Sequence, residues 1–201
     1  MGPEKLMTRI IAGTAGGRRI AVPGGRTTRP TSDRVREALF ASALSDLGGL
    51  DGARVLDLYA GSGAIGLEAL SRGAVHALLV ESDRRAVATL RKNVASLGLP
   101  GAQVAADRVR RVLESGSRDG PYDLVVADPP YAVTAEEVGA VLAALRDGGW
   151  PAPGALIVVE RASRGPHLEW PEGFTEARVR RYGEAALWYG RAASLSGLSR
   201  S

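Results

Sequence analysis

The amino-acid sequence contains no cysteine and only two histidines among its 201 residues. Without cysteine the chain can form no disulfide, no thiolate nucleophile and no cysteine-based zinc site, and we predict that it holds no metal. No apolar run approaches the length of a membrane span, and residues 1–9 lack the apolar stretch of a secretion signal. We therefore expect a cytoplasmic protein without membrane contacts.

Positive charge is concentrated near the start of the chain. Residues 1–36 hold eight Lys and Arg against two Asp and Glu, a net of +6, whereas the rest of the chain sums to −2. A basic segment on a near-neutral body is typical of a protein that binds a polyanion, although a merely solvated segment would have the same composition. The cations that we expect to contact nucleic acid are Arg9, Arg18, Arg19, Arg29 and Arg34.

The chain divides into an arm, one main domain and a tail, because 201 residues with 45% hydrophobic content suffice for a single core. Residues 9–12 and 18–22 are short β-like runs that flank glycines and predict a hairpin. We assign a basic hairpin arm to residues 1–28, the main domain to 29–190 and a disordered tail to 191–201.

Apolar strands alternate with helical stretches through the main domain. This alternation predicts an α/β fold with a mostly parallel, doubly wound, Rossmann-like sheet of seven strands. A helix after Thr31-Ser32-Asp33, ended by Gly48-Gly49, leads into the sheet, and a C-terminal antiparallel hairpin completes it. The expected strands are 54–58, 75–81, 102–106, 122–127, 155–160, 175–181 and 185–189, and the expected helices are 64–71, 83–97, 108–115 and 134–146.

A glycine-rich loop follows the first strand of the main domain. Gly61, Gly63 and Gly66 let the backbone approach a ligand closely at the start of a helix, where N–H groups point outward. The same G-x-G-x-x-G spacing, with Glu81 twenty residues beyond Gly61, also fits a nicotinamide dinucleotide. Taken alone, the loop predicts a nucleotide site of either kind.

Three acidic residues, Asp57, Glu81 and Asp107, lie at the ends of three successive strands. Asp57 suits the ammonium group of an amino acid better than a pyrophosphate, and a carboxylate in a buried strand needs a partner. Glu81 could bind ribose hydroxyls and Asp107 an adenine amino group, although either could instead be a helix N-cap. A nucleotide with an amino-acid tail is therefore the predicted ligand. Its candidate contacts are Asp57, Tyr59, Gly61, Ser62, Gly63, Glu81, Ser82, Asp107 and Arg108. Ser82 is also, with Asp83, a candidate to cap the following helix.

The tetrapeptide Asp128-Pro129-Pro130-Tyr131 follows the fourth strand. The prolines fix the backbone, so that the Asp128 carboxylate and a rigid carbonyl can accept hydrogen bonds from one exocyclic amine. Two acceptors localise a lone pair that is otherwise delocalised into a base ring, and Tyr131 supplies a face on which that base can stack. We take these four residues as candidate catalytic residues for the transfer of a methyl group to a guanine or adenine amine.

Four segments together resemble the bacterial 16S ribosomal RNA guanine-N2 methyltransferases over nearly the whole chain. They are residues 9–13 (RIIAG), 29–37 (RPTSDRVRE), 57–70 (DLYAGSGAIGLEAL) and 128–131 (DPPY). The second segment is the distinctive one, because the others are shared by many amino-methyltransferases. The resemblance implies a class I methyltransferase fold and transfer of a methyl group from S-adenosylmethionine to one guanine of the small-subunit RNA.

The resemblance also implies roles for the arm and the tetrapeptide. The arm, with Arg29 and Arg34, would bind 16S ribosomal RNA, and residues 128–131 would hold the guanine amine. The substrate would be an assembled or assembling small ribosomal subunit rather than a free nucleotide, and we expect the enzyme to be a monomer. The residues implied to contact S-adenosylmethionine are Asp57, Gly61, Glu81 and Asp107.

Three other functions remain open. The tetrapeptide serves adenine N6 equally well, but a DNA adenine methyltransferase usually carries a separate recognition domain, for which 201 residues leave no room. A nicotinamide oxidoreductase would need a hydride-transfer site, and the chain offers only His76, inside an apolar strand, and His167. A non-enzymatic RNA-binding module would explain the arm but neither the acids nor the tetrapeptide.

Overall fold

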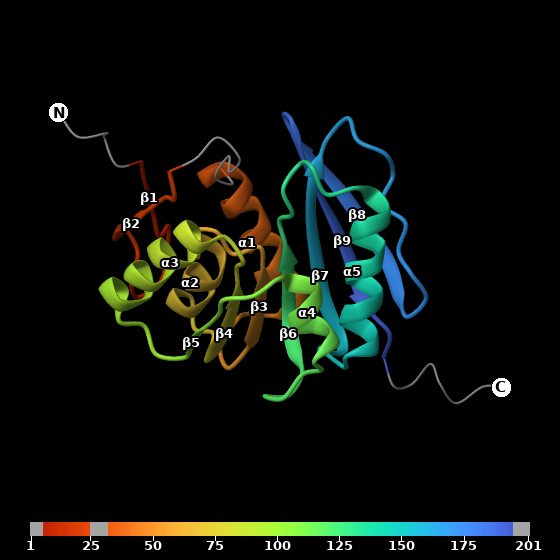
Figure 1. Cartoon of the computed structure of the whole chain (residues 1–201), viewed down its shortest axis with the longest axis horizontal. Coiled ribbons are helices and arrows are strands. Elements are labelled where there is room, and N and C mark those ends of the chain that lie inside the picture. Colours follow the sequence, from red (N-terminus) through yellow and green to blue (C-terminus); the bar gives the residue numbers. More distant parts are fainter. Residues whose placement is uncertain (1–5, 25–31, 195–201) are drawn as a thin grey trace.

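The computed structural model describes residues 6–24 and 32–194. Within these ranges a seven-stranded sheet is covered by helices on both faces, and a two-stranded hairpin lies against one helical layer (Figure 1). The strands are β1 (Met7–Arg9), β2 (Arg19–Ala21), β3 (Arg54–Leu58), β4 (His76–Val80), β5 (Ala102–Ala105), β6 (Tyr122–Ala127), β7 (Pro151–Ala162), β8 (Phe174–Tyr182) and β9 (Ala185–Ala192). The helices are α1 (Asp33–Leu47), α2 (Ala64–Ser71), α3 (Arg84–Leu97), α4 (Val109–Glu114) and α5 (Ala135–Asp147).

The main sheet has the strand order β5-β4-β3-β6-β7-β9-β8. The strands β3 to β7 run parallel, and β9 pairs antiparallel with both β7 and β8. The chain builds outward from β3 to β5 and then returns to the other side of β3, so the order reverses between β3 and β6. Such a switch point opens a crevice at the carboxyl ends of the strands. The predicted α/β fold, with its mostly parallel sheet and terminal antiparallel hairpin, is confirmed.

Successive side chains of each parallel strand point into two different cores. Val55 belongs to the core under α1, α2 and α3, whereas Leu56 belongs to the core under α4 and α5. Both faces are therefore buried, which explains the continuous apolar runs of these strands. Asp57 lies two residues after Val55 and so faces the α2 side. Among the described helices, none is long and apolar enough to cross a membrane.

The helices of the main domain begin and end within one residue of the predicted positions. The Ser32 hydroxyl accepts a hydrogen bond from the Val35 N–H at 3.2 Å and caps α1, while Gly48 ends that helix with φ 73°. Thr134 and Glu137 form a capping box at the start of α5. This box fixes the end of the loop that carries residues 128–131.

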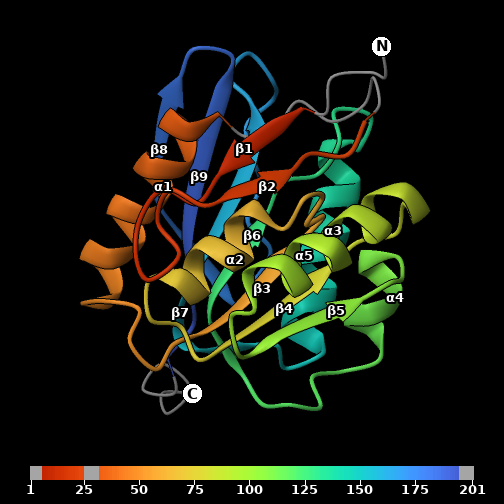
Figure 2. The same cartoon turned by 90° about the vertical axis from the view of Figure 1, so that its left-hand side faces the viewer.

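The hairpin arm differs from the prediction, because β1 ends at Arg9 rather than extending through residue 12. The N–H groups of Ile11 and Ala12 donate to the Glu68 carboxylate on α2 at 2.7 and 3.0 Å, which removes them from strand pairing. Ile20 of β2 is buried in the core shared with α1, α2 and α3. The arm therefore packs against the main domain and is hydrogen-bonded to α2 and α3 (Figure 2).

The C-terminal strands are longer than predicted. β7 begins at Pro151, which pairs with Tyr122 of β6 before a register shift. Prolines are rare inside strands, so the sequence pattern did not predict this first part of β7. β9 continues to Ala192, where it still pairs with β8. A disordered tail beginning at residue 191 is thus wrong for the first two residues, and residues 195–201 lie outside the described residues.

Candidate functional site

The candidate site lies at the carboxyl edge of the parallel strands. Leu58 at the end of β3 pairs with Val80 of β4 on one side and with Ala127 of β6 on the other, so these three strands end at the same level. The loops that follow them therefore emerge side by side. The structure brings four of the predicted acids to this edge: Asp57, Glu81, Asp107 and Asp128.

The glycine-rich loop turns sharply out of β3 into α2. Tyr59 has φ 64°, and among the described residues it is the only non-glycine residue with a positive φ. Such a conformation costs about 1–3 kcal/mol and is characteristic of ligand-binding turns. Gly63, with φ 82°, is the N-cap of α2, and a Cβ there would lie 2.4 Å from Leu90. The loop therefore depends on glycine for both its conformation and its packing.

Asp57 is buried beneath the first turn of α2, with 2% of its surface exposed. One carboxylate oxygen accepts a hydrogen bond from the Gly66 N–H at 2.9 Å. Burial raises the pKa of Asp57 to about 7; the Gly66 bond opposes that rise, and the charges of Asp128 and Glu81 add to it. Because these carboxylates repel one another, the site favours a ligand that carries positive charge.

Glu81 joins the glycine-rich loop to the end of β4. One carboxylate oxygen accepts the Gly61 N–H at 2.9 Å, and the other accepts the N–H groups of Ser82 and Asp83 at 2.7 and 2.8 Å. The N-cap of α3 is Asp83, whose side chain accepts two N–H groups of the first turn. The capping role predicted for Asp83 is therefore confirmed, whereas a capping role for Ser82 and the alternative interpretation of Glu81 as a helix N-cap are wrong.

Asp107 lies two residues before the first residue of α4, and Arg108 occupies the N-cap position of that helix without a side-chain capping bond. The Asp107 carboxylate accepts the Arg108 N–H at 2.8 Å and pairs with Arg111 at 3.5 Å. A hollow of about 410 Å³ opens between the loop after β5 and α3, lined in part by Ala106 and Ser82. The loops that carry Asp107 and Glu81 thus border an open space at the sheet edge.

Residues 128–131 leave β6 next to β3, where the Asp128 N–H donates to the Leu58 carbonyl at 3.3 Å. The Pro130 carbonyl accepts the Val133 N–H at 2.9 Å, which closes a tight turn. Pro129 is buried, whereas Tyr131 is 66% exposed. The loop therefore presents a large aromatic ring to solvent beside the Asp128 backbone.

Arg161, at the carboxyl end of β7, is a site residue to which the sequence patterns did not point. Its guanidinium donates to the Val133 carbonyl at 2.9 Å and so holds the turn that follows residues 128–131. Burial raises the pKa of Tyr59, the charge of Glu137 adds to that rise, and the charge of Arg161 opposes it. An arginine at the end of an apolar parallel strand is the signal that the sequence offered.

Replacement of Arg161 by Met keeps the aliphatic stem and removes the donor to Val133. If residues 128–131 hold the substrate and the glycine-rich loop holds the predicted nucleotide, we expect kcat to fall about 10- to 100-fold because the turn loses its support, while the dissociation constant for that nucleotide stays within about twofold. Turnover measurements and equilibrium dialysis test this. Arg161→Lys, which retains a donor, should recover part of kcat; an equal loss in both variants would contradict a positioning role.

The exposed cations of the N-terminal segment lie on the arm and at the start of α1. Arg19 and Arg34 are exposed, and the Arg9 side chain is 64% exposed despite an ion pair with Asp33 at 3.4 Å. Arg29 lies outside the described residues. Arg18 is exposed as well, so four of the five predicted RNA contacts are accessible to solvent.

Two other cations of this segment are engaged within the protein. Arg18 donates to the carbonyls of Ser96 and Leu97 at the end of α3. Arg36 is 1% exposed, pairs with Asp33 at 3.0 Å and lies 4.0 Å from Glu68, and its burial lowers its pKa. The charge available on the surface of the arm is therefore smaller than the count of +6 suggests.

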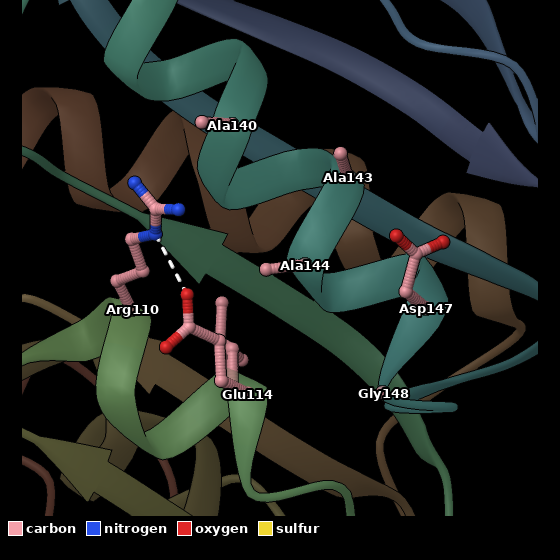
Figure 3. Close-up of a pocket in the computed structure, with 8 residues that line it drawn as sticks. Arg110, Glu114, Ala140, Ala143, Ala144, Asp147 and Gly148 are labelled. Atoms are coloured by element: carbon pink, nitrogen blue, oxygen red, sulfur yellow. Dashed lines mark hydrogen bonds and ion pairs between the residues drawn. The ribbon is translucent and has the colours of Figure 1, made fainter.

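A second hollow, of about 430 Å³, lies between α4 and α5 (Figure 3). Arg110 and Glu114 of α4 form an ion pair at 2.8 Å on one side, and Ala140 and Ala144 of α5 line the other. The residues that line it belong to α4, to α5 and to Gly148 at the end of α5, and none belongs to the loops at the carboxyl edge of the sheet. This hollow is separate from the candidate site.

The strand order, the glycine-rich loop and the acids at the carboxyl edge define a Rossmann-like class I methyltransferase. The family model described as Conserved hypothetical protein 95 matches residues 8–191. The ribosomal RNA small subunit methyltransferase D of Escherichia coli strain K12 is 43% identical over 155 residues, which cover 76% of this chain and 73% of the relative. The chain belongs to the family of ribosomal RNA small subunit methyltransferase D.

A second relative and a solved structure agree with that placement. The protein of the same name from Haemophilus influenzae is 35% identical over 169 residues, which cover 83% of this chain and 84% of the relative. The solved structure of Escherichia coli yhhF, provisionally described as a methyltransferase, superposes with a TM-score of 0.80. That comparison has 34% identity and covers 94% of this chain and 99% of the other.

Proposed function

We propose that this protein transfers a methyl group from S-adenosylmethionine to the exocyclic N2 amine of one guanine in 16S ribosomal RNA. The observation that carries the proposal is the arrangement of one edge of the sheet. There, the buried Asp57 carboxylate under the glycine-rich loop feels the charge of Asp128, the first residue of the loop that ends in the exposed ring of Tyr131. The relatives named for small-subunit RNA methylation support RNA as the substrate.

The residues at the glycine-rich loop fit S-adenosylmethionine. Asp57, buried next to two further carboxylates, favours a cationic group, and the amino-acid end of this cofactor carries an ammonium. The Glu81 carboxylate, held in place by three N–H groups, is oriented to accept ribose hydroxyls. Asp107 lies at the end of the next strand, where an adenine amino group could donate to it. When bound, the cofactor supplies a methyl group activated as a sulfonium.

The tetrapeptide prepares the amine for attack. The Pro130 carbonyl already accepts the Val133 N–H. The Pro129 carbonyl is therefore the second acceptor, and together with the Asp128 carboxylate it accepts hydrogen bonds from the two N–H groups of the amine. These two acceptors localise the nitrogen lone pair, and the Tyr131 ring stacks on the base and fixes its plane. Asp128 is also the candidate base for the proton that the amine loses after transfer, although a static acceptor role would suffice.

The exposed cations of the arm and of the start of α1 provide a test of RNA binding. Replacing Arg9, Arg19 and Arg34 together by Ala should weaken binding of 16S RNA and lower the slope of log affinity against log salt by up to about 3. Cofactor affinity should not change. The salt slope is measured by filter binding between about 50 and 200 mM salt. An unaltered slope would mean that these arginines are only solvated.

The proposed substrate is an assembled or assembling small ribosomal subunit, acted on in the cytoplasm by a monomer. An RNA that is already folded presents one guanine in a fixed setting, which suits a small protein without a separate recognition domain. The hydrogen bonds that hold the basic arm against the main domain support a folded RNA as the substrate, because they fix the distance between the phosphate contacts and the methyl donor.

Methylation of adenine N6 is the second candidate, since residues 128–131 accept either amine. A nicotinamide oxidoreductase has less support, because His76 lies at the start of β4, at the edge away from the site, where it contacts Tyr122 at 3.3 Å. His167 pairs with Glu176 at 3.3 Å.

The deciding assay supplies labelled S-adenosylmethionine with three substrates: small subunits that lack the modification, naked 16S RNA and duplex DNA. Nucleoside analysis then identifies the product. N2-methylguanosine from subunits or RNA is the expected result. N6-methyladenine from DNA would retain the chemistry and overturn the substrate, and no transfer to any of them would overturn the proposed function.

A further inference from the structure

Asn93, on α3, is a buried polar residue for which the sequence suggested no role. Its side chain is 3% exposed and uses every hydrogen-bonding group of its amide. The oxygen accepts the Ala21 N–H at 2.9 Å, and the nitrogen donates to the Ala21 carbonyl and to the Ser62 carbonyl, both at 2.8 Å. One amide therefore joins a strand of the arm to the glycine-rich loop.

On the arm side, Asn93 pairs with Ala21 as a neighbouring strand would, through one N–H and one carbonyl of the same residue. Arg18 adds a second attachment of the arm to α3 through the carbonyls of the last helical turn. Figure 2 shows β2 running across α3. The arm is therefore attached to α3 by hydrogen bonds at two places, so a shift of the arm would also shift α3.

On the loop side, Ser62 lies between Gly61 and Gly63, in the strained turn out of β3. Gly61 is held from the other side by Glu81, through its N–H. The conformation of this turn thus depends on two side chains, of which one belongs to the ligand edge and the other to α3. Only Asn93 of these two also contacts the arm.

We propose that Asn93 is a positioning residue that couples RNA binding on the arm to cofactor binding at the glycine-rich loop. The inference rests on the proposed function, because it takes RNA as the ligand of the arm and S-adenosylmethionine as the ligand of the loop. RNA that holds β2 in place also holds the Asn93 amide, which fixes the Ser62 carbonyl and preorganises the loop. Such coupling is reciprocal, so each ligand tightens the binding of the other by the same factor.

The test measures the dissociation constant of S-adenosylhomocysteine, which cannot react, with and without saturating small subunits that lack the modification. For the wild-type chain we expect the subunits to tighten binding about tenfold. In Asn93→Ser, whose short neutral side chain cannot span Ala21 and Ser62, that factor should fall to about one. Asn93→Asp keeps the acceptor for the Ala21 N–H but loses the donors to both the Ala21 and the Ser62 carbonyls, so it should lose the coupling as well.

The matched control is Ser71→Ala. The Ser71 hydroxyl donates to the Ala12 carbonyl and accepts the Ala15 N–H at 2.9 Å, so this variant loosens the arm without touching the glycine-rich loop. It should weaken subunit binding and keep the coupling factor. Thermal melting with S-adenosylhomocysteine identifies which variants are folded before their affinities are compared.

Three results would overturn the coupling role: no tightening in the wild-type chain, an unchanged factor in folded Asn93 variants, or an equal loss in Ser71→Ala. A kinetic split provides a second readout, because uncoupling should raise KM for both substrates and leave kcat within about threefold. If the wild-type chain methylates no ribosomal RNA at all, the proposed function fails instead, and the two failures are distinguishable.

Discussion

Asp128→Ala should lower kcat about 10²- to 10³-fold, because in the proposed mechanism the substrate amine then loses one of the two acceptors that localise its lone pair. Cofactor affinity should stay within a few-fold of wild type. The charge of Asp128 contributes to the raised pKa of Asp57, so removing it makes the ionised form of Asp57 easier to reach and leaves the cofactor pocket intact. Single-turnover rates with small subunits and equilibrium dialysis with S-adenosylhomocysteine measure the two quantities separately.

Asp128→Asn is the matched control, since it keeps an acceptor oxygen and removes the charge. If Asp128 acts mainly as an acceptor, this variant should retain about a tenth of the wild-type rate, because hydrogen bonds to ionised groups are roughly twice as strong as neutral ones. A rate as low as that of Asp128→Ala would assign the residue a base role. Loss of cofactor binding in both variants would place Asp128 in the cofactor pocket and contradict the proposed role.

The fold followed closely from local sequence signals. The strands β3 and β6 and the helix α2 have the predicted bounds, because apolar runs, glycines at helix ends and capping residues all act over a few residues. The parallel sheet also followed, since βα alternation permits few other arrangements. The prediction erred where a local signal misled, as with Pro151 at the start of β7.

The contacts that hold the site together could not be read from the sequence in the same way. Ile11 and Glu68 form a hydrogen bond although they are 57 positions apart in the sequence. The same separation divides Thr14 from Ser71, whose carbonyl accepts the Thr14 N–H. Nothing near Asn93 in the sequence indicates that its amide reaches both Ala21 and Ser62. The acids at the strand ends were accessible to sequence reasoning because parallel strands bring their carboxyl ends to one edge, whereas these contacts depend on how the arm packs.

Asp57 should make the stability of the cofactor-free protein fall as pH rises. The ordinary pKa of an aspartate is 3.8, whereas the pKa of Asp57 in the folded protein is about 7, so the native state holds a proton that the unfolded chain has released. The penalty is absent below about pH 4, grows between pH 4 and 7, and levels off above pH 7 at about 4 kcal/mol. Asp57→Asn should remove it, and chemical denaturation of both proteins at pH 5 and pH 8 measures the difference.

If the ammonium of S-adenosylmethionine pairs with the ionised form of Asp57, as we propose, cofactor binding should have the opposite pH dependence. Below pH 7 binding must release the proton, so affinity should weaken up to about tenfold for each pH unit lost and stay level above pH 7. Asp57→Asn should bind about 10- to 100-fold more weakly at pH 8, because it loses a charge-assisted contact, and should show no such slope. Titration of S-adenosylhomocysteine across pH 5.5 to 8.5 tests both; a slope that persists in Asp57→Asn would assign the proton to another group, and a flat profile in the wild-type chain would mean that the carboxylate is not the partner of the ammonium.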